Sequence, residues 1–185
     1  MKRILPVLVV LVLLCGCGSG QEMGRVLSLR ERLLTSDGCR FDAVITADYG
    51  DETYVFSMNC SFDMEGNMNF TVTDPQSIAG ITGTISQAGG KLTFDDQALV
   101  FQMLADGMVT PVSAPWLLIK TLRGGYLSSC GNDQDMLRVM IDDSYESNAL
   151  HLDVWLDGGD VPVRGEILWQ GRRVLSVEVR NFSYV

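Results

Sequence analysis

The stretch TYVFSMNCSFDM, residues 53–64, shows the pattern that decides the fold. Apolar side chains occupy every second position from Tyr54 to Met64, and mostly polar side chains stand between them. Successive side chains of a β-strand point to opposite faces of its sheet, so this alternation predicts one buried face and one face in water. The stretch therefore predicts a strand of an antiparallel sheet that is covered on one side.

The same alternation recurs before and after this stretch. It is found in residues 39–48, 68–72, 137–141, 150–156, 163–169 and 175–179. Turn-forming residues separate several of these runs, as at positions 49–51, 65–67, 157–160 and 170–171. No regular alternation of strands with helices is visible. We therefore predict about nine or ten short strands in a single antiparallel sheet.

Two segments carry a helical pattern instead. Residues 22–35 have apolar side chains at helical spacing and end at a breaker cluster, residues 36–38. Residues 116–122 are apolar on nearly all sides, and a helix of this kind has to be covered. The natural place for it is the apolar face of the sheet. We therefore predict one mainly β, α+β domain over residues 22–185, in which an N-terminal helix and a mid-chain helix cover the apolar face of a curved sheet.

The beginning of the chain has the pattern of an export signal. Two basic residues precede an apolar run, residues 4–14, which is too short to span a bilayer. The run leads into Leu14-Cys15-Gly16-Cys17, which resembles a bacterial lipobox, where a cysteine after small residues receives lipid. Cys17 fits this role because Gly16 precedes it, whereas bulky Leu14 precedes Cys15. An ordinary signal peptide that contains cysteines is the alternative.

Lipidation at Cys17 would divide the chain into a signal peptide of residues 1–16, a lipidated tether of residues 17–21 and the domain. The net charge of −9 gives the chain no attraction for anionic lipid, so acyl chains such as palmitate would have to anchor it. We therefore expect a lipoprotein on the extracytoplasmic face of a cell membrane.

Three cysteines, Cys39, Cys60 and Cys130, follow the export signal. If residues 49 and 50 form a two-residue loop, counting outward places Cys39 opposite Cys60, at a separation that a disulfide can bridge. Export makes an oxidising compartment plausible. A loop longer by two residues would shift this pairing, and two buried free thiols are the alternative. Cys130 has no predicted disulfide partner in either case.

Composition excludes several classes of function. The single histidine excludes zinc sites built on two histidines, and the acidic balance argues against nucleic-acid binding, which needs clustered Lys and Arg. No nucleotide-binding loop and no G-x-S-x-G motif is present. His151 shares a strand face with Asp153, a pair capable of acid–base work, but no nucleophile motif accompanies it. We therefore expect no enzymatic activity, no metal and no cofactor.

Three tripeptides match the N-glycosylation pattern, at residues 59–61, 69–71 and 181–183. The bacterial lipobox makes these matches uninformative as glycosylation sites.

Residues 74–81, DPQSIAGI, and residues 90–96, GKLTFDD, resemble a stretch of the LolA/LolB-like lipoproteins, which are lipoprotein-carrier-like half barrels. Residues 110–116, TPVSAPW, and the closing residues 179–182 extend the resemblance. It is closer to lipoproteins of spore-forming Firmicutes, a group that includes a germination lipoprotein. The resemblance implies an incomplete barrel whose concave apolar face is covered by helices. LolA itself is soluble, whereas this chain is expected to be anchored, and no functional residue is carried over.

Two functions agree with these features. The first is a non-enzymatic interaction or structural module of the cell envelope, with another envelope protein as its partner. The alternative is binding or transfer of a lipid or a lipoprotein acyl chain in the concave apolar face. That face would hold either an open cavity or a closed core. The side chains expected to line a cavity are Phe41, Phe56, Met58, Phe70, Trp116, Leu118 and Leu122.

Overall fold

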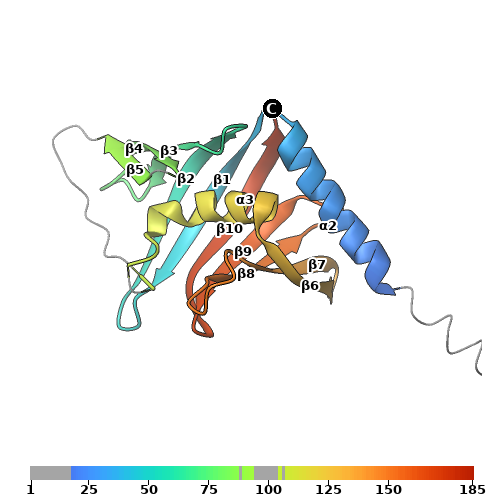
Figure 1. The fold of residues 1–185 in the computed structure, drawn as a ribbon. Helices are drawn as coiled ribbons and strands as arrows, with labels where there is room; N and C mark the ends of the chain where they lie inside the picture. Colours follow the sequence, from blue (N-terminus) through green and yellow to red (C-terminus); the bar gives the residue numbers. More distant parts are fainter. Residues whose placement is uncertain (1–17, 88, 94–103, 106) are drawn as a thin grey trace, which may run out of the picture.

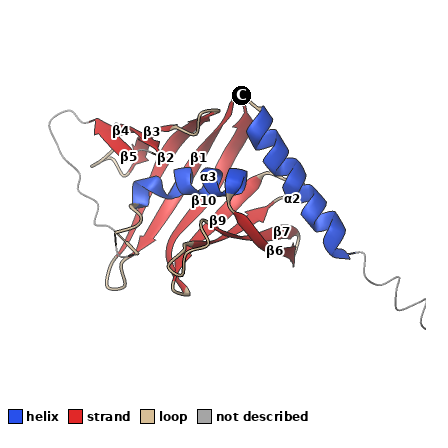
Figure 2. Cartoon of the chain, in the orientation of Figure 1, coloured by secondary structure: helices blue, strands red, loops and turns tan. Residues whose placement is uncertain are grey.

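The computed structural model describes residues 18–87, 89–93, 104–105 and 107–185. Within them, ten strands form one open antiparallel sheet in the order β5-β4-β3-β2-β1-β10-β9-β8-β7-β6. The strands are β1 (Gly38–Asp48), β2 (Thr53–Asp63), β3 (Met68–Asp74), β4 (Thr82–Ser86), β5 (Gly89–Thr93), β6 (Tyr126–Asp133), β7 (Met136–Asp142), β8 (His151–Leu156), β9 (Pro162–Trp169) and β10 (Arg172–Tyr184). The helical elements are α2 (Gly18–Thr35), the short 3-10 helix η2 (Pro111–Ser113) and α3 (Ala114–Gly124). The predicted fold class, a mainly β protein with one curved sheet and two helices, is confirmed (Figure 2).

The first and last strands pair with each other in the middle of the sheet. Strands β1 to β5 extend from this pair to one edge, and strands β10 to β6 extend to the other (Figure 1). The chain end is held at the same place, because the Val185 N–H donates to the Gly38 carbonyl and the Asp37 N–H donates to the Val185 carbonyl. Residues far apart in the sequence therefore meet along the central seam of the sheet.

Helix α3 lies across the apolar face of the sheet (Figure 1) and contacts strands of both halves, among them β1, β2, β7 and β8. Helix α2 contacts α3 and the edge strand β6. The face of α2 that carries Val26, Leu29 and Leu33 is buried, whereas Leu27 and Leu34 are about half exposed. None of the described helices is both long and apolar enough to cross a membrane.

Helix α2 begins one turn earlier than the sequence pattern predicts, at Gly18 rather than Glu22. The extra turn consists of glycine, serine and glutamine residues, which carry no apolar side chain and so leave no periodic signal. The segment expected to be a tether is therefore helical from Gly18 onward. The predicted end before Ser36 is confirmed. The signal peptide and Cys17 lie outside the described residues.

The turn between β1 and β2 is longer than expected. The Tyr49 N–H donates to the Glu52 carbonyl over 2.9 Å, and the Asp48 carboxylate accepts the Gly50 N–H over 2.7 Å. These bonds close a turn of four residues, and Asp48 consequently pairs with Thr53. The two-residue loop predicted from the sequence is wrong because the Asp48 side chain holds the wider turn in place.

The wider turn removes the geometric argument for a disulfide. Cys39 lies opposite Phe62 and Cys60 lies opposite Phe41, so the predicted direct pairing of the two cysteines is wrong. Both are buried free thiols, and Cys130 is free as well. Burial raises the pKa of Cys39 to about 12 and raises the pKa of Cys60 too. Because the thiolate is the reactive form, these two cysteines act as core residues.

Candidate functional site

The side chains expected to line an apolar cavity lie in the hydrophobic core. Phe41, Phe56, Met58, Phe70, Leu118 and Leu122 are all buried, and Trp116 is partly buried against them. Leu118 fills the space above β9 so closely that a Cβ atom at Gly165 would lie 2.7 Å from its Cδ1. The structure thus brings the seven predicted residues together, with α3 packed among them.

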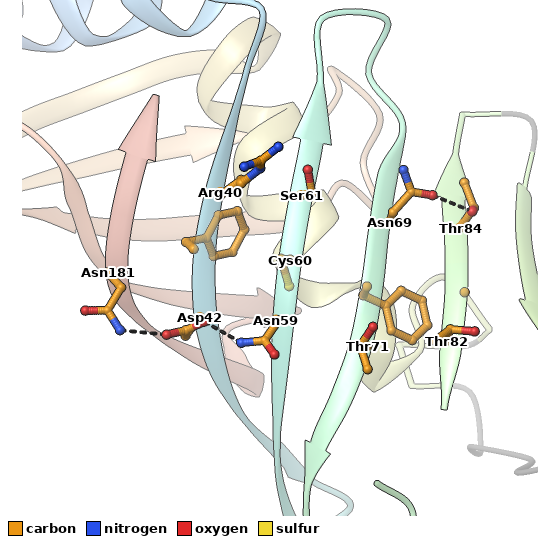
Figure 3. A pocket seen from close by; sticks show the side chains of 13 residues that line it. Arg40, Asp42, Asn59, Cys60, Ser61, Asn69, Thr71, Thr82, Thr84 and Asn181 are labelled. Atoms are coloured by element: carbon orange, nitrogen blue, oxygen red, sulfur yellow. Dashed lines mark hydrogen bonds between the residues drawn. The ribbon is translucent and has the colours of Figure 1, made fainter. Parts of the chain in front are cut away.

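A hollow of about 600 Å³ lies on the opposite, polar face of the sheet, over strands β1 to β4. We call it the polar groove (Figure 3). Two rows of side chains cross it, because the strands pair in register. The first row is Asp42, Asn59, Thr71 and Thr82, and the second is Arg40, Ser61, Asn69 and Thr84.

Asp42 organises one end of the polar groove. Its two carboxylate oxygens each accept a hydrogen bond from an amide, Oδ1 from Asn59 Nδ2 over 2.5 Å and Oδ2 from Asn181 Nδ2 over 2.6 Å (Figure 3). Asn181 sits at a register shift where β10 carries an extra residue opposite β1, and its φ is +52°. Asparagine tolerates this left-handed conformation better than most residues. The bulge thereby turns the Asn181 amide toward Asp42.

A second hydrogen bond orients the amide on the far side of the polar groove. The Thr84 hydroxyl on β4 donates to Asn69 Oδ1 on β3 over 2.7 Å (Figure 3). With its oxygen engaged, the amide of Asn69 presents N–H donors to the groove. Two formal charges, on Arg40 and Asp42, line this site and cancel each other. The polar face of the groove therefore carries no net formal charge, and hydrogen bonds orient its three amides.

Sequence reasoning missed this site, although a signal for it was present. Each of the three N-glycosylation matches is an asparagine, an apolar residue and a serine or threonine. On a strand the first and third residues of such a tripeptide face the same side. The tripeptides lie on β2, β3 and β10, and the asparagine of each lines the polar groove.

His151, the candidate acid–base residue, lies outside the polar groove in a network of charged side chains. Its Nδ1 is 2.7 Å from Asp142 Oδ1, and its Nε2 faces Asp153 Oδ1 at 3.4 Å. Asp153 is only 3% exposed and accepts a hydrogen bond from Arg138 over 2.6 Å. Because a carboxylate faces each ring nitrogen, neither nitrogen is directed at a substrate. The sequence indicated the pair with Asp153 but not the contacts with Asp142 and Arg138.

The network continues across β8 and β9 around Trp155. The guanidinium carbons of Arg138 and Arg164 lie 5.4 Å and 4.6 Å from the centre of its ring, and the side chain of Trp155 is buried. Arg164 and Arg173 both bind Glu166. Burial alone would raise the pKa of Glu166, but hydrogen bonds from these two arginines outweigh it and hold the pKa below its usual range. The network joins four strands, which is a structural role.

Metal binding has no support in the described part of the chain. It contains no group of three or more histidine, cysteine, aspartate or glutamate side chains placed to hold a metal ion.

No protein-family model and no curated protein matches the chain. Solved structures similar to it include an uncharacterized conserved protein from Thermus thermophilus, with 11% identity, a TM-score of 0.46 and coverage of 88% of this chain and 87% of that chain. A LolA superfamily protein from Nitrosomonas europaea has 9% identity, a TM-score of 0.38 and coverage of 85% and 92%. A putative outer membrane lipoprotein-sorting protein domain from Vibrio parahaemolyticus has 8% identity, a TM-score of 0.39 and coverage of 86% and 90%.

These similarities do not assign the chain to a family, because identity and TM-score are both low. Two of these three structures carry lipoprotein-sorting or LolA descriptions. The expected link to Firmicutes lipoproteins and to the germination group stays a prediction.

Proposed function

We propose that this chain is a lipid-anchored interaction module of the bacterial cell envelope, and that it recognises its partner through the polar groove. The observation that carries the proposal is the contrast between the two faces of the sheet. The apolar face is packed against α3, whereas the polar face over β1 to β4 is hollowed and lined with oriented hydrogen-bonding groups. A pre-oriented polar surface on rigid strands is suited to recognition, since little freedom is lost on binding.

A non-enzymatic role agrees with the chemistry of the polar groove. Its polar side chains are amides, hydroxyls and the two opposite charges of Arg40 and Asp42, above a floor of buried apolar residues. General acid–base catalysis needs a group free to exchange a proton with a substrate. Asp42 is instead engaged by two amides, and the nitrogens of His151 face carboxylates. The groove is equipped to bind and orient a ligand.

Anchoring rests on the lipobox-like residues that precede α2. Acylation of Cys17 would place the lipid next to the first residue of α2, Gly18, and would hold the domain close to the membrane surface. We therefore place the protein on the extracytoplasmic face of a cell membrane, within reach of other envelope components.

Photo-crosslinking in intact cells tests this proposal. A photoreactive phenylalanine analogue at Thr82, in the polar groove, is expected to give a discrete adduct of higher mass with an envelope component. The control is the same analogue at Tyr145, which is 83% exposed, lies on the loop between β7 and β8 and already carries an aromatic ring. An adduct absent from Thr82, or equally strong from Tyr145, would contradict recognition through the polar groove.

Acyl-chain binding is a second candidate function, and the contacts that hold α3 against the sheet favour it. Side chains bind backbone groups near its two ends, with Trp116 donating to the Gly66 carbonyl and Arg123 to the Met64 carbonyl. Leu117, Leu118 and Ile119, in the middle of the helix, are buried in the hydrophobic core, so outward movement of the helix would uncover an apolar trough. Native mass spectrometry of the purified full chain would then show one noncovalent acyl lipid per chain. A spectrum without such a ligand would contradict this candidate.

A further inference from the structure

The polar groove gathers its hydrogen-bonding groups from three copies of one short pattern. The tripeptides at residues 59–61, 69–71 and 181–183 each combine an asparagine with a serine or threonine two positions later. Because residues two apart on a strand face the same side, the tripeptides on β2 and β3 each place one amide and one hydroxyl in the groove. The third tripeptide contributes the amide of Asn181, which the bulge in β10 directs there. Thr82 and Thr84 on β4 add two further hydroxyls in the same way.

Because the strands pair in register, these amides and hydroxyls form a regular array on the polar face, which we call the lattice. Asn59 pairs with Thr71, and Ser61 pairs with Asn69, so amides and hydroxyls alternate both along and across the strands. Neighbouring strands are about 4.8 Å apart, which fixes the spacing of the groups across the groove. A lattice of this kind is complementary to a ligand that carries polar groups at regular intervals, that is, to a polymer.

The free donors and acceptors of the lattice indicate the chemistry of the ligand. A carboxamide has two N–H donors and one carbonyl acceptor. Among the described residues, Asn59 and Asn181 each use one N–H on Asp42, and Asn69 uses its oxygen on Thr84. Each amide therefore keeps further hydrogen-bonding capacity in a fixed orientation. Groups that both donate and accept, such as sugar hydroxyls and acetamido groups, match this mixture.

Charge and shape argue against other polymers. The opposite charges of Arg40 and Asp42 cancel within the groove, and the whole chain has a net charge of −9, so phosphate polymers would be repelled. Peptide recognition uses pockets for apolar side chains or pairing with a sheet edge. The apolar residues at the floor of the groove, Phe41, Cys60 and Phe70, are buried in the core and leave no such pocket.

We propose that the polar groove binds an uncharged glycan chain, with Asn59, Asn69 and Asn181 as the specificity-determining side chains. This inference rests on the proposed function, which it deepens by naming the class of ligand. Amides contact hydroxyl and acetamido groups of successive sugars, and Asp42 holds two of the amides in position.

Calorimetric titration of the purified full chain with the hexasaccharide of N-acetylglucosamine tests the inference. We expect saturable binding that weakens at least about fivefold in Asn59→Ala and in Asn69→Ala, since a lost hydrogen bond in a fixed site costs roughly one kcal/mol or more, which corresponds to about fivefold in affinity. Both asparagines are exposed, so these changes leave the fold intact, as an unchanged midpoint of thermal unfolding would show. Asn132→Ala, at an exposed asparagine on β6 outside the groove, is the matched control and should bind like the parent.

Absence of saturable binding, or equal affinity of Asn59→Ala and Asn132→Ala, would overturn the glycan inference. Such a result combined with a discrete protein adduct from Thr82 in cells would leave the interaction module standing with a protein partner. If neither glycan binding nor an adduct from Thr82 is observed, the proposed interaction module is overturned as well.

Discussion

Replacing Leu118 by alanine is expected to lower the free energy of unfolding by about 3 kcal/mol. Leu118 lies in the middle of α3, is 1% exposed and packs directly over Gly165 on β9. Strands of both halves of the sheet contact the helix and hold it in place, so the loss of the side chain leaves a cavity as well as removing buried apolar surface. Denaturant unfolding followed by tryptophan fluorescence measures the change.

Leu34→Ala is the matched control for this prediction. Leu34 is also a helical leucine, but it is 52% exposed on α2, and its removal should change the free energy of unfolding by no more than about 0.5 kcal/mol. If Leu118→Ala costs less than about 1 kcal/mol, α3 does not fill the apolar face in solution, and the acyl-chain candidate gains support.

Replacing Gly38 by alanine is expected to cost at least about 3 kcal/mol of unfolding free energy. Gly38 opens β1 with a φ of +155°, a conformation that residues with a side chain rarely adopt. A Cβ atom there would lie 2.2 Å from the carbonyl oxygen of Phe62, which belongs to the backbone of β2 and cannot turn aside. The substitution therefore has to separate β1 from β2 at the point where the chain end is also bound.

The same substitution at Gly24, Gly24→Ala, is expected to have the opposite effect on stability. Gly24 lies inside α2, and a Cβ atom at this position would meet nothing within 4 Å. Alanine favours helix more than glycine, so stability should rise by up to about 1 kcal/mol. Circular dichroism during thermal unfolding measures both variants, and similar effects of Gly38→Ala and Gly24→Ala would contradict the close strand contact at Gly38.

Alternation of apolar and polar residues located the strands that bury one face in the core and missed the strands that do not. Strands β1, β2 and β3 and strands β7 to β10 bury one face in the hydrophobic core, and this burial selects an apolar residue at every second position. Strands β4 and β6 lie toward the two edges of the sheet, where most of their residues are at least partly exposed. Without burial on one face, no alternation is required, and the pattern is lost.

The candidate site shows a different limit of sequence reasoning. The sequence pattern indicated which apolar residues lie in the core. Whether these residues enclose a cavity depends on the volume that α3 fills, and a local sequence pattern does not reveal that volume. The polar groove depends on register, and the register depends on a four-residue turn held by one carboxylate, that of Asp48. The tripeptides at residues 59–61, 69–71 and 181–183 carried the information, but only the pairing of β10 with β1 and β2 with β3 brings them together.

The pairing of β1 with β10 has a consequence for how the chain reaches its native state. A chain made from its N-terminus first can form the hairpins of each half as soon as they appear, since these contacts are local. The two halves can be joined only when the final strand, Arg172–Tyr184, is available to lie against β1. Until then the edge of β1 stays unpaired, as a template for any other extended segment. Pairing of β10 with β1 therefore removes an exposed strand edge that would otherwise favour aggregation.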